Sequence, residues 1–218
     1  MENSINFYKS IYKEIDSIIK NRFLEFEKFK NKTDYEIFIE FCFCLFTPQN
    51  KAIFADLAIK KLLEKDLLLN GKLEEIIDNI KGLVRFHQNK SKYLIDARNK
   101  IFITKKIKLK EILFSEKSNL NNLDKRKIIY ENFLGLGMKE SSHFLRNIGL
   151  GENLAILDRH ILKNLKKLNV IKDIPKTLTY KKYLDIEKKM LLFSEKINIK
   201  LKYLDFVFWY KETGAVFK

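Results

Sequence analysis

Cysteine, proline and glycine are all scarce in this sequence. Its 218 residues include only 2 cysteines, 2 prolines and 7 glycines. Two cysteines are too few for an iron–sulfur cluster held by four cysteines, so we expect no cluster. Cys42 and Cys44 lie in an apolar run, and we expect both to be reduced core residues of an intracellular protein. With few helix-breaking residues and apolar residues recurring at helical spacing, the sequence predicts an all-α fold.

Segments and clusters that would indicate a membrane or a metal are also missing. No apolar run approaches the ~20 residues of a membrane span, and no signal peptide is visible. His143 and His160 have no cluster of cysteines or carboxylates at ligand spacing, so we interpret both as structural or DNA-facing. We expect a cytoplasmic protein with no membrane partner, no metal and no other cofactor.

Positive charge, by contrast, is abundant. The chain carries 43 lysines and arginines against 28 acidic residues, a formal net charge of +15. Such an excess suits a polyanionic partner whose attraction weakens as salt is added. Arg146 and Arg159 are expected to pair with phosphates or carboxylates. The length is sufficient for one domain or two small ones.

The segment 133–160, FLGLGMKESSHFLRNIGLGENLAILDRH, has the pattern of a helical hairpin followed by a third helix. Gly135 and Gly137 occupy alternate positions of the turn, where glycine can adopt positive φ at little cost. The helix that follows begins with unpaired backbone amides and the positive end of its dipole, which together suit a phosphate. We therefore expect Gly135 and Gly137 to bind DNA phosphate.

In this segment and the two residues after it, GLGMKESSHFLRNIG and AILDRHIL resemble the helix-hairpin-helix DNA glycosylase superfamily. In detail they are similar to its compact archaeal and bacterial members, the type 2 8-oxoguanine DNA glycosylase/AP lyases. Lys139 matches the catalytic lysine of that family, and Asp158 matches its catalytic aspartate. The resemblance implies a bifunctional base excision repair enzyme that acts, as a monomer, on double-stranded nucleoid DNA containing oxidised guanine.

The residue types at these two positions suit that chemistry. At a helix N-terminus the dipole disfavours the ammonium form of Lys139, and a neutral amine can attack C1′ of a damaged nucleoside and leave a Schiff base. An unpaired Asp158 would stabilise the positive charge that develops on the sugar. Base excision and β-elimination would both follow. The alternative is that Lys139 is a solvated helix residue and Asp158 a helix N-cap.

Other segments predict contacts with the substrate. Thr47-Pro48-Gln49-Asn50 resembles a polar corner of the family that faces the lesion, so Gln49 and Asn50 are either DNA contacts or structural caps. Phe86 follows a basic residue in GLVRFHQNKSKY, a run that also resembles the family, and is either a base-stacking residue or an ordinary core aromatic.

The C-terminal sequence resembles the ending of the family, a tryptophan nine residues before a terminal lysine. That resemblance implies that Trp209 lines the base pocket, with core packing as the alternative, and that Lys218 contacts the lesion. 8-Oxoguanine carries an N–H donor at N7 where guanine has an acceptor, so selectivity needs an acceptor there. The α-carboxylate of Lys218, or a backbone carbonyl, could supply it.

The resemblance further implies two helical domains with DNA in a cleft between them. We expect a central domain at residues 33–151, which carries the hairpin, and a second domain formed by residues 1–32 and 152–218. Two other functions remain open. One is a glycosylase for oxidised pyrimidines, which the hairpin, Lys139 and Asp158 would serve equally. The other is a non-catalytic DNA-binding module.

Local patterns predict individual helices. Residues 5–29 form an amphipathic stripe, and Thr33 with Glu36 has the pattern of a capping box. The helix that follows should end at Thr47-Pro48, and another should run from Tyr93 to Ile101. The first stripe comprises Tyr8, Ile11, Tyr12, Ile15, Ile18 and Ile19, and the capped helix should bury Tyr35, Phe38, Ile39, Cys42 and Phe46.

Overall fold

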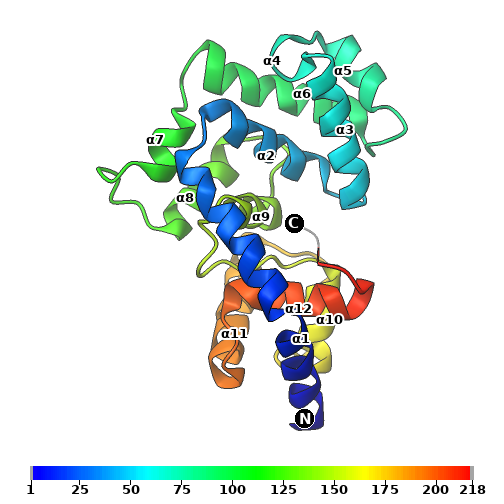
Figure 1. The fold of residues 1–218 in the computed structure, drawn as a ribbon, viewed down its shortest axis with the longest axis vertical. Coiled ribbons are helices and arrows are strands. Elements are labelled where there is room, and N and C mark those ends of the chain that lie inside the picture. The colour runs from blue at the N-terminus through cyan, green and yellow to red at the C-terminus, as the bar shows by residue number, and fades with distance from the viewer. Residues whose placement is uncertain (1, 217–218) are drawn as a thin grey trace. The chain divides into compact units, whose positions relative to one another are not determined.

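The computed structural model describes residues 2–216, and these residues form helices and connecting turns without a β-strand. The all-α prediction is confirmed (Figure 1). The helices are α1 (Glu2–Glu27), α2 (Asp34–Phe46), α3 (Ala52–Glu64), α4 (Leu67–Asn70), α5 (Leu73–Ile80), α6 (His87–Arg98), α7 (Leu109–Phe114), α8 (Asn122–Asn132), α9 (Met138–Asn147), α10 (Arg159–Lys167), α11 (Tyr180–Ile197) and α12 (Leu201–Thr213). A 3₁₀ turn, η1 (Lys28–Asn31), follows α1, and a π-helical turn, η2 (Asn99–Ile103), follows α6.

The chain divides into two compact units. One comprises residues 30–144, and the other comprises the described residues on either side of them. The division falls within α9, so residues 145–151 group with the terminal helices rather than with the predicted central domain. The reason is Arg146, whose guanidinium lies 4.1 Å from the Phe206 ring centroid and 3.1 Å from the Asp205 carboxylate. That these units are two domains with DNA bound between them remains our proposal.

In the unit 30–144, α2 is the central element. Its start is the predicted capping box: the Thr33 hydroxyl accepts from the Glu36 amide, and the Glu36 carboxylate accepts from the Thr33 amide. Every residue from Glu40 to Phe46 is buried, so this part of the helix has no solvated face. The predicted burial of Tyr35 and Ile39 is wrong, because both lie at the partly exposed first turns. The helix ends at Phe46, as the Thr47-Pro48 pair predicts.

The other unit combines the N-terminal helix with the C-terminal helices. Helix α1 packs against α12, which also contacts α10 and α11 (Figure 1). Aromatic rings fill the α1–α12 contact: Tyr8 lies edge-on to Phe208 with centroids 5.1 Å apart, and Phe23 lies edge-on to Phe206 at 6.0 Å. The predicted stripe is correct for Tyr8, but Ile18 is 49 % exposed.

The helix that we predicted from Tyr93 to Ile101 starts earlier in the structure. Helix α6 begins at His87, directly after Phe86, and not near Tyr93. Its first turns, HQNKSK, carry no apolar stripe, so periodicity gave no sign of the helix. Further along, the Asn121 side chain accepts from the amides of Leu123 and Asp124 and so caps the start of α8.

Candidate active site

The hairpin turn joins α8 to α9, and its two glycines serve different purposes. Gly135 has a φ of +84°, and a β-carbon there would lie 2.5 Å from the Tyr93 ring and 2.7 Å from Leu45. Both the backbone conformation and the space therefore require glycine. Gly137 does not adopt positive φ, contrary to our prediction, although a β-carbon there would lie 3.0 Å from the Glu140 carboxylate.

Lys139 is the second residue of α9, as the sequence predicts. Its side chain is 23 % exposed, and its Nζ lies 3.7 Å from Oε1 of Glu140. The lysine is thus largely buried at the positive end of a helix with one carboxylate beside it, rather than a freely solvated residue. We did not predict a role for Glu140. Its position in the first turn of the helix, where acidic residues are common, is the only feature of the sequence that points to it.

A second lysine, Lys90 of α6, is buried in the same unit. Its Nζ donates hydrogen bonds to the backbone carbonyls of Phe46, at 2.9 Å, and Pro48, at 2.7 Å. Burial lowers the pKa of Lys90 to about 8; nearby Lys139 and Arg85 also lower that pKa, while Glu140 raises it. Sequence reasoning missed this residue, because nothing distinguishes it from the neighbouring lysines of NKSK until the fold buries it.

The polar corner after α2 holds Gln49 and Asn50. Asn50 donates from Nδ2 to the carbonyl oxygen of Leu83 at 3.0 Å, a bond between two loops and not the predicted helix cap, and its DNA contact stays a prediction. Gln49 is exposed and has a φ of +53°, which is uncommon for a residue other than glycine. Its role in DNA contact stays a prediction.

Phe86 is an aromatic residue that does not belong to the core. It is 53 % exposed, it has a φ of +57°, and it precedes α6 as the N-cap residue. The guanidinium carbon of Arg85 lies 5.4 Å from its ring centroid. The core alternative is therefore wrong, and an exposed ring beside a cation is suited to stacking on a base.

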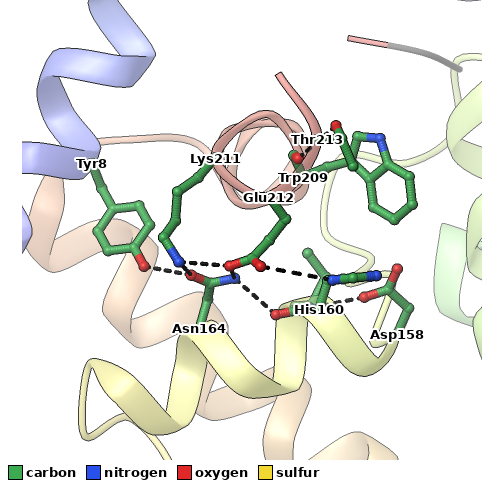
Figure 2. Close-up of polar contacts among 9 residues, drawn as sticks. Tyr8, Asp158, His160, Asn164, Trp209, Lys211, Glu212 and Thr213 are labelled. Carbon is green, nitrogen blue, oxygen red and sulfur yellow. Dashed lines mark hydrogen bonds and ion pairs between the residues drawn. The ribbon is translucent and has the colours of Figure 1, made fainter. Parts of the chain in front are cut away.

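Asp158 lies in the other unit, at the start of α10. Its Oδ1 accepts a hydrogen bond from the Ile161 amide at 2.8 Å, so it is the N-cap of this helix (Figure 2). The N-cap alternative is confirmed, and the expectation of an unpaired carboxylate is wrong for this oxygen. A capping aspartate is held in a fixed orientation, which is compatible with the catalytic role that stays a prediction.

Trp209 is partly exposed on α12 and contacts His160 rather than the core alone. The two rings are edge-on, with centroids 5.2 Å apart and an interplanar angle of 87°. Nδ1 of His160 lies 4.0 Å from Oε2 of Glu212, and the hydrogen bond from Lys211 to Glu212 is the main cause of the lowered pKa of that glutamate. His160 therefore links the predicted base-pocket residue to a carboxylate.

Asn164 joins this group to α1. It accepts hydrogen bonds from the Tyr8 hydroxyl and from Lys211, and it donates to Glu212 at 3.2 Å. Figure 2 shows the side chains of Lys211, Glu212 and Asn164 meeting between Tyr8 and His160. Sequence reasoning did not foresee the network, because its members come from three helices distant in sequence. Lys218 lies outside the described residues.

Arg146 and His143 are structural, whereas Arg159 is exposed and its pairing stays a prediction. Arg146 pairs with Asp205, which confirms the carboxylate alternative for this arginine. Burial raises the pKa of Asp205, Arg146 lowers it, and the negative charge of nearby Asp158 raises it further. His143 is buried against Phe43, with ring centroids 6.0 Å apart. Within residues 2–216, no three histidines, cysteines or acidic residues are grouped to hold a metal ion.

Comparison with known proteins identifies the family of this chain. Residues 19–199 match the family model described as 8-oxoguanine DNA glycosylase. The chain is 46 % identical to the 8-oxoguanine DNA glycosylase/AP lyase of Fusobacterium nucleatum, with 98 % of this chain and 97 % of the relative covered. It is 39 % identical to the enzyme of that name from Methanocaldococcus jannaschii, with 94 % of each covered.

Solved structures give the same result for the fold. The M. jannaschii 8-oxoguanine glycosylase/lyase, in complex with a 15mer DNA containing 8-oxoguanine, matches with a TM-score of 0.86 and 38 % identity over 98 % of this chain and 99 % of that one. The 8-oxoguanine DNA glycosylase of Thermotoga maritima matches with a TM-score of 0.87 and 28 % identity over 100 % of both chains. The fold is that of a helix-hairpin-helix glycosylase. The chain belongs to the 8-oxoguanine DNA glycosylase family.

None of the helices in the described part of the chain combines the length and the apolar character needed to cross a bilayer.

Proposed function

We propose that this protein is a bifunctional base excision repair enzyme, which removes 8-oxoguanine from double-stranded DNA and then cleaves the strand at the abasic site. Its family supports both activities, since its curated relatives are named for them. The observation that carries the assignment within this chain is Lys139, largely buried in the first turn of α9 directly after the glycine hairpin.

The chemistry follows from that amine. In its neutral form, Nζ of Lys139 attacks C1′, the glycosidic bond breaks, and the base leaves with the bonding electron pair and takes up a proton. Opening of the sugar ring gives a Schiff base between Nζ and C1′. Loss of a proton from C2′ then expels the 3′ phosphate, which is β-elimination, and hydrolysis of the imine frees the enzyme. Asp158 stabilises the positive charge that develops on the sugar.

The hairpin holds the DNA backbone in this proposal. We assign phosphate binding to the amides of Gly135 and Gly137, in the turn that precedes the positive N-terminal end of α9. Glu140 lies in the first turn of α9 and carries the opposite charge, and its Oε1 lies 3.7 Å from Nζ of Lys139. The net charge of +15 adds the long-range attraction.

Recognition of the lesion is assigned to four residues. Phe86 and Trp209 both expose aromatic rings that suit stacking on bases, and Gln49 is exposed on the polar corner. Lys218 is proposed to contact the lesion and to place an acceptor opposite the N7–H of 8-oxoguanine. We propose further that the protein acts as a monomer on nucleoid DNA.

Strand cleavage tests the assignment. The duplexes would contain 8-oxoguanine, an oxidised pyrimidine or normal guanine, and Lys139→Gln would be compared with Lys127→Gln, an exposed lysine of α8. We expect cleavage of the 8-oxoguanine duplex by the wild-type protein and by Lys127→Gln, and none by Lys139→Gln, which should still bind DNA. Cleavage confined to the pyrimidine duplex would keep the mechanism and overturn the substrate. Binding without cleavage of any duplex would indicate a DNA-binding module.

A further inference from the structure

Two loops of the unit 30–144 carry residues that we propose to contact DNA. The corner loop is residues 47–51, with Gln49, and the stacking loop is residues 82–86, with Phe86. Both residues are exposed, and both have positive φ, +53° and +57°. For residues other than glycine this conformation costs roughly 1–2 kcal/mol each, and it persists only where the surrounding structure holds it in place.

Two polar side chains supply that restraint. Lys90 is only 5 % exposed, and its Nζ donates to the carbonyls of Phe46 and Pro48, the residues on either side of Thr47. Asn50 of the corner loop donates to the carbonyl of Leu83 in the stacking loop. Since Lys90 belongs to α6, which starts directly after Phe86, each loop is tied to the element of the other.

A lysine is a costly choice for this position. Burial of an ammonium group is unfavourable, as the lowered pKa of Lys90 shows, and a methionine would fill a similar volume without that penalty. What methionine lacks is the ability to donate to two carbonyls at once. The carbonyl of Phe46 ends α2, where a cation also meets the negative end of the helix dipole.

We propose that Lys90 and Asn50 form a clamp that joins the corner loop and the stacking loop into one rigid platform, and that this platform positions Phe86 and Gln49 on the DNA. Both are positioning residues, because neither is placed to touch the reacting atoms. The inference rests on the proposed function and extends it.

Excision and elimination should depend on the clamp to different extents. Excision of 8-oxoguanine requires the base to leave the stack, and an aromatic ring held in place lowers the cost of the gap. Elimination at an abasic site requires no base to be extruded. Loss of the clamp should therefore slow excision much more than it slows elimination.

Single-turnover rates of the full-length protein test this on two duplexes, one with 8-oxoguanine and one with a preformed abasic site. For Lys90→Met and for Asn50→Ala we expect excision to fall by about tenfold or more, with elimination changed less than about threefold. Lys92→Met, an exposed neighbour on α6, is the matched control and should match wild type in both rates. If Lys90→Met does not fold, Asn50→Ala carries the test alone.

A double-mutant cycle with Phe86→Ala gives a readout that a general loss of stability would not produce. If Lys90 acts through Phe86, Lys90→Met should change excision little once Phe86 is alanine, so the two effects should be clearly less than additive. Additive effects, or an equal fall of excision and elimination, would overturn the clamp.

The proposed function and the clamp fail in distinguishable ways. A wild-type protein that excises no 8-oxoguanine overturns the function, and the clamp with it. An active wild-type protein whose Lys90→Met and Asn50→Ala variants keep the wild-type ratio of excision to elimination overturns the clamp alone.

Discussion

Asp158 is the residue at which a structural role and a catalytic role coincide. It caps α10 through a hydrogen bond from the Ile161 amide, and it is our proposed electrostatic partner of the reaction. Asparagine caps helices as well as aspartate does but carries no charge, so one substitution separates the roles. We expect Asp158→Asn to leave the unfolding free energy almost unchanged and to lower single-turnover excision by roughly 10²-fold.

Asp158→Ala is the companion variant, since it removes both the charge and the cap. It should lower excision at least as much and should also cost about 1 kcal/mol of stability. Full excision activity in Asp158→Asn would show that the carboxylate acts only as a cap.

Gly135 and Gly82 have nearly equal positive φ, so a comparison of the two separates backbone strain from lack of space. Gly135 has a φ of +84° with Tyr93 and Leu45 in the way of a β-carbon, whereas Gly82 has a φ of +80° with nothing within 4 Å. Gly82→Ala should therefore cost only the backbone strain, about 1 kcal/mol, and Gly135→Ala clearly more. Denaturant unfolding of both variants measures the difference. Equal losses would mean that the hairpin yields to the added methyl group.

At the scale of the element, α2 is restrained at both ends by side chains. At its start, hydrogen bonds from Lys32 and from Thr33 lower the pKa of Glu36 to about 2, below its usual value of 4.5. A carboxylate with a lowered pKa stabilises the fold above pH 4.5, and this contribution is lost as the pH falls towards 2. We expect the stability difference between wild type and Glu36→Gln to shrink over that range in pH-dependent unfolding. A constant difference would contradict the capping box.

At the other end of α2, the buried Lys90 gives a pH dependence of the same sign, but at higher pH. Its folded-state pKa of about 8 lies below the usual 10.5, so the unfolded chain binds more protons between these values. The unfolding free energy of the wild type should therefore rise with pH in this window, relative to Lys90→Met. Lys92→Met should follow the wild type. If the difference in unfolding free energy between wild type and Lys90→Met does not vary with pH, folding does not lower the pKa of Lys90, which would contradict its burial.

Most helices were predictable from sequence, because a capping box or an apolar stripe is a local signal. The prediction of the Thr33–Glu36 box was correct for this reason. The start of α6 was not predictable, because its polar first turns are held by tertiary contacts such as those of Lys90. The hairpin and the position of Lys139 at the start of α9 followed from motif and spacing.

The residues that surround the predicted site residues could not be predicted from sequence patterns. Glu140, Lys90 and Glu212 matter because of what the fold places beside them, and nothing in a linear pattern separates them from other charged residues. Phe86 was open between core and surface, and only its exposure in the structure decides between the two. Motifs identify residues that act directly, whereas residues that position them depend on three-dimensional contacts.

At the scale of the whole molecule, the net charge of +15 predicts how the protein finds DNA. Affinity for undamaged duplex should fall linearly in a plot of log K against log salt, because lysines and arginines displace counterions from phosphates. Fluorescence anisotropy at several salt concentrations measures the slope. The single-turnover rate at saturating enzyme should change far less with salt. Salt-independent binding would contradict an electrostatic interface.

The central claim is that Lys139 is the nucleophile of a glycosylase specific for 8-oxoguanine, and borohydride trapping tests it most directly. The reductant converts a Schiff base between protein and DNA into a stable amine. Peptide mapping of the trapped adduct then identifies the attacked residue. We predict an adduct with 8-oxoguanine duplex but not with undamaged duplex, located on Lys139 and absent from Lys139→Gln. An adduct on any other residue, or trapping that persists in Lys139→Gln, would contradict the account.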